Sequence, residues 1–343
     1  MEFTLEENRR MFDICNITQW HEAGYKGQGI KIAIFDRNFK DSEEARKLFN
    51  NKVRFIDGYG KTSDKSSHGS MTAYIIHQIL PEAEIYVMRP RVDNIYWCIE
   101  NGMDIISVSM TLFQREGFKE ASEKAIENDI LLLSSSGNNS EEWNIGRPAR
   151  KKTWIGVGAV HLMNPGSNRE RISRARYSSY TKDEKEIWEM VEIMGFAGVY
   201  ILSPTNQTRP FSYYGTSCAC PWVASMSGLL KQIKKFTKKN FRDLDFIQEN
   251  VIEIDEEGYS RKTGHGLFRL PDVYELEKKL REQRRLDIVS EHPDIKGHWA
   301  EESLVKAIDK DVIRGYKDGT VKPDETITRA EVVVILARLG LLN

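Results

Sequence analysis

The chain has 343 residues, of which 40% are hydrophobic and 29% are charged, and its formal net charge is −1. This length predicts one large domain and leaves room for a small second one, because domains typically contain about 100–200 residues. The balanced charge lacks the basic excess of nucleic-acid-binding proteins, so nucleic acid is not an expected partner. A lysine-rich segment at 231–239 is better explained as a solvated helix face and helix end.

The first ten residues contain no apolar signal-peptide core, and no later segment is long and apolar enough to span a membrane. We therefore expect no membrane partner. The four cysteines are Cys15, Cys98, Cys218 and Cys220. Such sparse cysteines suit reduced thiols better than a disulfide framework. Both features predict a cytoplasmic location.

Short apolar runs alternate with helix-like stretches over the first 160 residues. Strands are predicted at 30–35, 84–88, 104–109, 130–134 and 154–160, and helices at 42–48, 70–79, 94–101 and 119–128. Apolar strands without polar alternation are typical of parallel sheets that are covered on both faces, and the helices are long enough for crossover connections. The sequence therefore predicts an α/β fold with a parallel sheet flanked by helices.

The composition changes after residue 268. A charged helix is expected around 275–285, followed from residue 293 by a short unit with a helix at 301–310. A turn at 317–320 precedes a second helix, which begins at Thr328. We expect a main domain at 1–282, with an N-terminal extension at 1–20, a linker at 283–292 and a small helical module at 293–343.

Ser217 lies in Gly215-Thr216-Ser217, which follows the turn-rich segment 204–214 and precedes an apolar stretch. This pattern places one serine at a glycine-led junction between a loop and a helix. A hydroxyl is a poor nucleophile unless a base, an orienting carboxylate and donors to an oxyanion are nearby. The sequence offers a candidate for each of these groups.

Asp36 ends an apolar strand, at the edge where open α/β sheets place their sites. His68 begins a helix of small residues, with Gly69 permitting close approach of neighbouring backbone. Asn138 follows another strand and carries an amide donor. Taken singly, each is more typical of a cap, an exposed histidine or a turn. In combination they predict an orienting acid, a general base and an oxyanion donor for Ser217.

In this order the four residues resemble the subtilisin-like serine proteases, or subtilases, and the resemblance covers most of residues 15–275. Further matching segments lie at 27–30, 156–160 and 264–267. The resemblance implies a catalytic triad of Asp36, His68 and Ser217, with Asn138 in the oxyanion hole. It further implies a serine endopeptidase that works through an acyl-enzyme and requires no cofactor.

The resemblance also implies that an extended substrate lies beside residues 107–111, with a specificity pocket between this segment and residues 135–137. The residues assigned to substrate binding in this way are Ser107, Val108, Ser109, Met110, Ser135, Ser136, Gly137 and Gly146. Backbone pairing would give affinity and the pocket selectivity. The nearby charges of Glu141, Glu142 and Arg147 leave the cleavage preference open.

Several residues depart from the family pattern without removing a catalytic group. Met71 stands where a second histidine is usual, and Cys218 and Cys220 flank Ala219 after the serine. The two cysteines are expected to be small buried packing residues, although a bulky reagent on Cys218 would block activity. The family often binds structural calcium, but no acidic cluster here has convincing ligand spacing, so calcium stays open and is not predicted.

The C-terminal segment resembles an S-layer homology motif through residues 298–300, 315–320 and 327–331. Thr328 and Glu331 predict a capping box, and an apolar helix face follows at Val332, Val333, Ile335 and Leu336. The resemblance implies contacts between a cell-wall polysaccharide and Trp299 and Arg329. Wall binding would require release by lysis or non-classical export, given the expected cytoplasmic location.

Only one such repeat is present, whereas the family usually has three, so self-association and docking on the main domain are alternatives to glycan binding. A helical packing module without glycan affinity is a further one. For the whole chain, the alternative to an endopeptidase is an inactive protease fold that serves as a scaffold for a wall polysaccharide or a protein assembly.

Overall fold

The computed structural model describes residues 5–37, 39, 43–56, 68–110, 116–140, 153–180, 191–203, 206–237, 249–254 and 260–342. The chain divides into two compact units, residues 1–272 and 273–343. The segment predicted as a linker, 283–292, falls largely within a helix, α9 (Val273–Glu291). The domain limits at 282 and 292 stay predictions.

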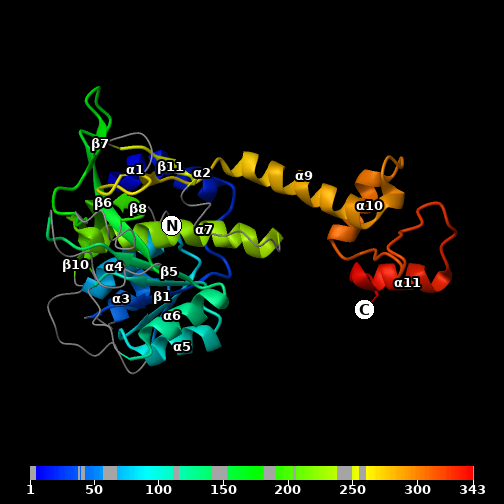
Figure 1. Cartoon of the computed structure of the whole chain (residues 1–343), viewed down its shortest axis with the longest axis horizontal. Helices are drawn as coiled ribbons and strands as arrows, with labels where there is room; N and C mark the ends of the chain where they lie inside the picture. The colour runs from blue at the N-terminus through cyan, green and yellow to red at the C-terminus, as the bar shows by residue number, and fades with distance from the viewer. Residues whose placement is uncertain are drawn as a thin grey trace. The chain divides into compact units, whose positions relative to one another are not determined.

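A mainly parallel sheet forms the centre of the first unit (Figure 1). Its strands, in spatial order, are β11 (Val251–Ile252), β12 (Leu267–Phe268), β8 (Ile193–Phe196), β6 (Ile155–Met163), β5 (Leu131–Ser135), β4 (Ile105–Val108), β1 (Lys31–Phe35), β3 (Glu84–Met88) and β2 (Val53–Phe55). All neighbours on this path are parallel except β11 and β12. The predicted fold class is confirmed.

Three further strands lie outside this path. β7 (Arg171–Arg174) pairs antiparallel with β6, while β9 (Val199–Ser203) and β10 (Asn206–Tyr213) form a separate antiparallel hairpin. None of the three was predicted. The hairpin leads directly into the loop that carries Gly215, so it helps to position the candidate site.

Helices cover both faces of the sheet. On one face, α5 (Val92–Glu100) and α6 (Phe118–Glu127) pack on side chains of β1 that include Ala33 and Phe35. α4 (His68–Ile79) and α7 (Thr216–Thr237) pack together, and α7 also contacts β4, β5, β6 and β8. Figure 1 shows α5 and α6 on the side of the sheet away from α7. Ile32 and Ile34, which alternate with Ala33 and Phe35, are buried as well, as expected for a strand covered on both faces.

The N-terminal residues belong to the core of the first unit. α1 (Arg9–Ile14) and α2 (Ile17–Glu22) bury Phe12, Ile17 and Trp20 completely or nearly so. Before them, in the short helix η1 (Glu6–Asn8), the Asn8 side chain donates to Gln78 Oε1 at 2.8 Å and to the Tyr200 carbonyl at 2.7 Å. The described part of 1–20 is thus integrated in the fold.

The predicted elements agree well with the observed ones, since each predicted strand and helix of the first 160 residues ends within three residues of its counterpart. All four cysteines are free and buried, as expected of reduced thiols. Lys231 differs from expectation, because it is 2% exposed and its ammonium donates to the Asp129 carbonyl at 2.7 Å. Among the described residues, no helix is sufficiently long and apolar to traverse a bilayer.

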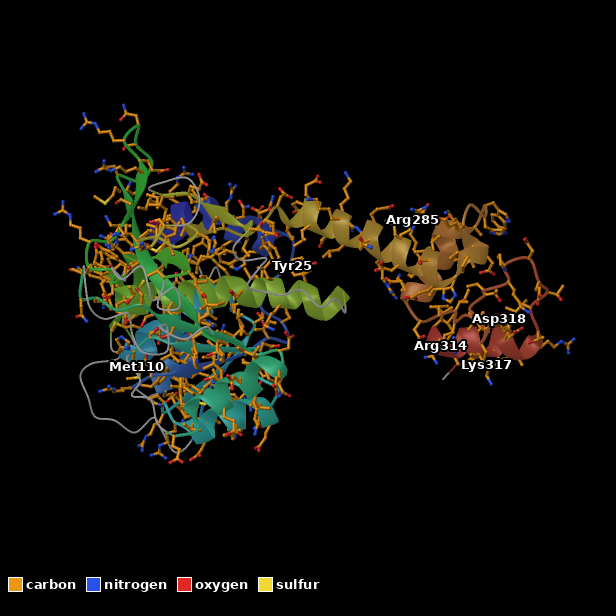
Figure 2. All side chains as sticks on the ribbon, in the orientation of Figure 1. Tyr25, Met110, Arg285, Arg314, Lys317 and Asp318 are labelled. Atoms are coloured by element: carbon orange, nitrogen blue, oxygen red, sulfur yellow. The ribbon has the colours of Figure 1, made fainter. Side chains whose placement is uncertain are left out.

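The second unit is helical and has a small core of its own. It contains α9, the short helix η2 (Pro293–Ile295), α10 (Glu301–Asp309) and α11 (Arg329–Arg338). The core consists of Ile288, Val289, Ile295, Val305 and Val321. Figure 2 labels Arg314, Lys317 and Asp318, which come from the loop between α10 and α11.

α11 begins with the predicted capping box. Thr328 Oγ1 accepts from the Glu331 amide at 3.2 Å, and the Glu331 carboxylate accepts from the Thr328 amide at 2.7 Å. No residue of α11 is buried, so the predicted apolar face at Val332 and Val333 is open to solvent.

Candidate active site

Three adjacent parallel strands end at the same edge of the sheet, and each is followed by a candidate residue. Asp36 follows β1, Ser109 follows β4, and Asn138 lies three residues beyond β5. The first residues of two helices supply His68 and Ser217, from α4 and α7 respectively. Ligand and catalytic sites of open α/β sheets lie at this carboxyl edge.

Asp36 and His68 form a close pair. His68 Nδ1 lies 2.8 Å from Asp36 Oδ1 and 2.9 Å from Oδ2. The carboxylate is 1% exposed, and it also accepts from the Arg37 amide at 2.6 Å and from Thr72 Oγ1 at 3.4 Å. A Cβ at Gly69 would lie 3.1 Å from the Arg37 carbonyl oxygen, which explains why a glycine follows His68. The expected close approach of backbone at Gly69 is confirmed.

The pKa of His68 reflects two opposing influences. Burial alone would lower the pKa, but the hydrogen bond and the charge of Asp36 outweigh burial, so the pKa is raised above 6.5. Because the carboxylate can only accept, the Nδ1–H of neutral His68 points to Asp36 and the lone pair lies on Nε2. His68 is thereby prepared to accept a proton at Nε2.

Ser217 lies in the first turn of α7, as the glycine-led junction predicted. Its hydroxyl donates to the Ser109 carbonyl at 3.0 Å, and no hydrogen bond joins the described side chains of Ser217 and His68. Tyr213 lies beside His68, with ring centroids 6.1 Å apart and an edge-to-face angle of 84°. The Tyr213 hydroxyl is enclosed and makes no hydrogen bond of regular geometry with a described residue. Burial, with added effects of Cys218 and Asp36, strongly raises the pKa of its phenol, while the neighbouring Ser217 side chain opposes the rise.

Asn138 is held by the residue that precedes Ser217. Asn138 Oδ1 accepts from the Thr216 amide at 2.8 Å and from Thr216 Oγ1 at 3.0 Å. These two bonds fix which side of the amide carries the oxygen, so Nδ2 is the donor that faces away from Thr216. Gly215 adopts φ +103°, and a Cβ there would lie 3.1 Å from Asn138 Nδ2. Glycine therefore leaves the space beside this donor open.

The residues assigned to substrate binding differ in their surroundings. Ser107 and Val108 lie within β4, whose backbone pairs with β1 on one side and β5 on the other. Their backbones therefore cannot pair with a substrate strand, and only Ser109 and Met110 lie beyond the strand end. Met110, labelled in Figure 2, is partly exposed.

The second predicted wall of the pocket begins at the end of β5. Ser135 and Ser136 are buried, and the Ser136 hydroxyl is enclosed without a hydrogen-bond partner. Gly137 is partly exposed, with φ +111° and an amide that donates to Thr216 Oγ1 at 3.1 Å. Gly146, also assigned to substrate binding, lies outside the described residues.

Sequence reasoning missed two residues that hold the site. Thr216 bonds to Asn138, and its place between Gly215 and Ser217 was a signal that could have identified it. Tyr177 accepts a hydrogen bond at its hydroxyl from the Gly215 amide, at 3.0 Å. No local pattern around Tyr177 indicated this contact, which depends on the tertiary fold.

Two other expectations concern metals and thiols. The described residues contain no group of three or more His, Cys, Asp or Glu side chains that could hold a metal ion.

Cys218 is fully buried, and burial raises the pKa of its thiol to about 12. The expected burial of Cys218 is confirmed, whereas the loss of activity on modification by a bulky thiol reagent stays a prediction.

A parallel α/β sheet with an Asp–His pair and a helix-leading serine at its carboxyl edge defines the class of serine hydrolases with a subtilisin-like fold. The model of the subtilase family matches residues 16–266, and that of the S-layer homology domain matches residues 293–333. The chain therefore belongs to the subtilase family of serine peptidases and carries a C-terminal S-layer homology domain.

Characterised relatives are proteases of bacilli. Minor extracellular protease Epr of Bacillus subtilis (strain 168) is 27% identical over 286 residues, which cover 74% of this chain and 40% of Epr. Subtilisin DY of Bacillus licheniformis is 26% identical over 231 residues, covering 60% of this chain and 78% of the relative. The chain thus spans less than half the length of Epr.

Solved structures show the same fold. The prenylagaramide maturation protease PagA aligns with a TM-score of 0.60 and 16% identity, covering 76% of this chain and 97% of PagA. Sphericase aligns with a TM-score of 0.57 and 19% identity, covering 72% and 93%. At these identities the likeness concerns the fold alone. The S-layer homology domain favours association with a cell surface, and no finding supports the predicted cytoplasmic location.

Proposed function

We propose that the chain is a serine endopeptidase whose catalytic triad is Asp36, His68 and Ser217. The observation that supports this most strongly is the hydrogen bond between His68 Nδ1 and the buried Asp36 carboxylate, at 2.8 Å, at the start of α4, which packs on the helix α7 that carries Ser217. Membership in the subtilase family supports the same reaction class and implies polypeptide substrates.

In this proposal His68 Nε2 takes the proton of Ser217 Oγ as the oxygen attacks a peptide carbonyl carbon. The hydroxyl must first exchange its bond to the Ser109 carbonyl for one to His68. His68 then gives the proton to the leaving amine, and water releases the acyl group by the reverse steps. Asp36 keeps the imidazole in the productive tautomer and stabilises its cation without accepting the proton.

Asn138 Nδ2 and the backbone amide of Ser217 are the proposed donors to the oxyanion. The amides of Thr216, Cys218 and Ala219 already donate to Asn138 Oδ1 or to the Gly215 carbonyl, whereas no acceptor among the described residues is bonded to the Ser217 amide in this first helical turn. The bonds from Thr216 to Asn138 Oδ1 orient the side-chain donor. Proton transfer and charge stabilisation both come from the chain, so the proposed reaction includes no cofactor.

Incubation with a mixed-sequence peptide library tests the proposal. The wild-type protein and Ser217→Ala are compared, cleavage sites are read by mass spectrometry, and Ser217 is probed with a fluorophosphonate. We expect turnover by the variant to fall by about 10⁶-fold, because loss of the nucleophile removes the function of the whole triad. A wild-type protein that neither cleaves nor labels would instead support the inactive scaffold.

For the C-terminal unit we propose attachment to a cell-wall polysaccharide at the cell surface, with Trp299 and Arg329 as contacts. Support comes from the S-layer homology match and from exposure, since Trp299 is 90% exposed and Arg329 is exposed. An exposed aromatic ring suits a sugar face, and an exposed guanidinium suits an anionic substituent.

Co-sedimentation with purified, protein-free bacterial walls tests this role. Arg329→Ala is expected to weaken sedimentation about 10-fold or more, a loss typical of one charge-assisted contact. Lys310→Ala is the control, because Lys310 is an exposed cation of the same unit outside the motif. Equal sedimentation of all three proteins would exclude the Arg329 contact, and the self-association alternative would then remain.

A further inference from the structure

Pro221 lies inside α7, four residues after Ser217. In an α-helix the carbonyl of each residue accepts from the amide four residues later. Proline has no amide hydrogen, and its ring also pushes the carbonyl of the residue four positions earlier away from the helix. The Ser217 carbonyl therefore lacks the amide donor that a regular α-helix would place four residues later.

Ser109 supplies the missing donor. Its hydroxyl donates to the Ser217 carbonyl at 3.1 Å. Ser109 is 3% exposed, so water has little access to replace this donor. A carbonyl that is shielded from water and has no partner is costly, and the structure satisfies this partly buried one with a side chain from the end of β4.

The same strand end is joined to the same helical turn by several further contacts. The Ser217 hydroxyl donates back to the Ser109 carbonyl at 3.0 Å. Cys220 Sγ lies 3.6 Å from the Val108 carbonyl and 3.6 Å from Ser107 Oγ. The backbone of Ser217 is thus fixed against β4, on the side of α7 where Pro221 interrupts the helical bonds.

We propose that the Ser109 hydroxyl is a positioning group for Ser217, and that Pro221 makes it necessary. The inference rests on the proposed function, because positioning matters to catalysis only if Ser217 is the nucleophile. The hydroxyl acts on the backbone of Ser217 and not on the substrate. It fixes the point from which Oγ must reach both His68 and a scissile carbonyl, a geometry on which rate depends steeply.

A double-mutant cycle on the full chain tests this inference. Ser109→Ala removes the donor and keeps the Ser109 carbonyl, whereas Pro221→Ala supplies a helical amide to the Ser217 carbonyl. We expect Ser109→Ala to lower kcat about 10-fold, equivalent to about 1.4 kcal/mol, with KM changed less than about 2-fold. In the Pro221→Ala background the same substitution should lower kcat by less than about 2-fold, because the hydroxyl is then redundant.

Ser227→Ala is the matched control. Ser227 is a buried serine of the same helix, and its hydroxyl donates to the Val223 carbonyl at 2.9 Å. That carbonyl keeps its helical amide partner when the hydroxyl is removed, so kcat should not change. All values of kcat are normalised to the fraction of Ser217 that a fluorophosphonate labels, which removes any effect of misfolded protein.

Two kinetic outcomes would overturn the proposal: an unchanged kcat in Ser109→Ala, or a loss that persists undiminished in the Pro221→Ala background. A wild-type protein that neither cleaves nor labels would refute the proposed function, and thermal unfolding of the same four proteins then tests the contact itself. The proposal predicts that Ser109→Ala has a lower Tm than the wild type. It also predicts that the double variant has nearly the same Tm as Pro221→Ala, because the hydroxyl is then redundant. If Ser109→Ala does not fold, the double variant must fold, and its failure would also overturn the proposal.

Discussion

At His68, burial and the Asp36 carboxylate act on the pKa in opposite directions, and the carboxylate prevails. The raised pKa suits a general base that must be neutral before attack and cationic afterwards. The ion pair between His68 and Asp36 forms only when His68 takes up the proton. Asp36 is itself held by the Arg37 amide, which keeps the carboxylate in place through the proton transfer.

The pH dependence of kcat/KM should follow from this balance. Because the pKa of His68 lies above 6.5, activity should fall as the pH decreases through a midpoint above 6.5. In Asp36→Asn, burial acts unopposed, so the midpoint should move to lower pH while the rate at high pH falls about 10⁴-fold. Glu120→Gln, at an exposed carboxylate of α6, should leave the profile unchanged. An Asp36→Asn midpoint at or above that of the wild type would contradict this account.

At Glu192, which directly precedes β8, the effect of burial on the pKa is the larger one, in contrast to His68. Burial raises its pKa from 4.5 to about 7, a hydrogen bond from the Gly156 amide opposes the rise, and Oε2 is enclosed without a partner. A carboxyl whose pKa is raised by folding binds its proton more tightly in the folded state. Its contribution to stability is therefore complete below pH 4.5 and is lost as the pH rises through 7.

Glu192→Gln should remove this pH dependence. The pKa of the wild-type carboxyl is about 7 in the folded state and 4.5 in the unfolded state. This difference of about 2.5 corresponds to about 3 kcal/mol of unfolding free energy. We expect the variant to gain stability over the wild type at pH 8 and to show little difference at pH 4.5, measured by urea unfolding. Glu123→Gln, at an exposed carboxylate of α6, serves as the control. A difference independent of pH would count against a buried, titrating Glu192.

Among the elements, the segment after β7 joins the two loops of the candidate site. The Tyr177 carbonyl accepts from the Ser140 amide at 2.9 Å, and Ser179 Oγ accepts from the Asn139 amide at 3.0 Å. The Tyr177 hydroxyl accepts from the Gly215 amide at 3.0 Å. One short segment thus contacts both the loop of Asn138 and the loop of Ser217, which together would form the oxyanion hole.

Tyr177→Phe should loosen this arrangement. The variant keeps the ring and loses only the acceptor for Gly215, at a cost of about 1 kcal/mol in unfolding free energy and about 10-fold in kcat. Tyr180→Phe is the control, because this nearby ring interacts with Arg174 and Lys262 and its hydroxyl bonds to no described residue. Active-site titration combined with thermal unfolding measures both effects. Equal kcat values for the two variants would show that the Gly215 contact does not support catalysis.

The sequence predicted the elements whose signal is local. β1, β3, β4, β5 and β6 are apolar runs buried on both faces, and the crossover helices are amphipathic or small, so composition alone located them. β12 has two residues and β9 continues an apolar run that is broken only at Gly198, with φ +80°. No pattern of period two is long enough to mark these strands.

The candidate site likewise contains residues that the sequence predicts and contacts that it does not. Asp36, His68, Asn138 and Ser217 stand in short motifs at element ends, and such ends can be predicted. The bonds from Ser109 to Ser217 and from Tyr177 to Gly215 join residues far apart in the sequence. Lys231 shows the limit of charge patterns, because a lysine-rich run predicted solvent exposure, whereas this side chain is buried and its ammonium reaches the carbonyl of Asp129, just after α6.

On the scale of the whole molecule, the two units differ in how completely they bury apolar residues. The first unit encloses α7 from Cys218 to Ile233. The second unit has a core of five residues and leaves α11 without a buried residue. Its exposed apolar side chains include Val333 at 53%, Val334 at 46% and Leu341 at 66%. Several large apolar side chains that are exposed close together in the sequence are typical of an interaction site.

Glycan contacts at Trp299 and Arg329 leave these apolar side chains for a second use, and we predict that the unit also self-associates through α11 and the residues that follow it. The chain should therefore show a mass that rises with concentration in sedimentation velocity. Val333→Asp combined with Leu341→Asp should shift the chain toward a monomer, because each carboxylate would have to be desolvated in the interface. Hydrolysis of a short soluble peptide should not change, since both substitutions lie in the second unit. Ile126→Asp is the control, because Ile126 is 45% exposed on α6 of the first unit. A wild-type chain that stays monomeric at every concentration would contradict this prediction. It would then favour a different partner for α11, and the wall polysaccharide would be the first one to test.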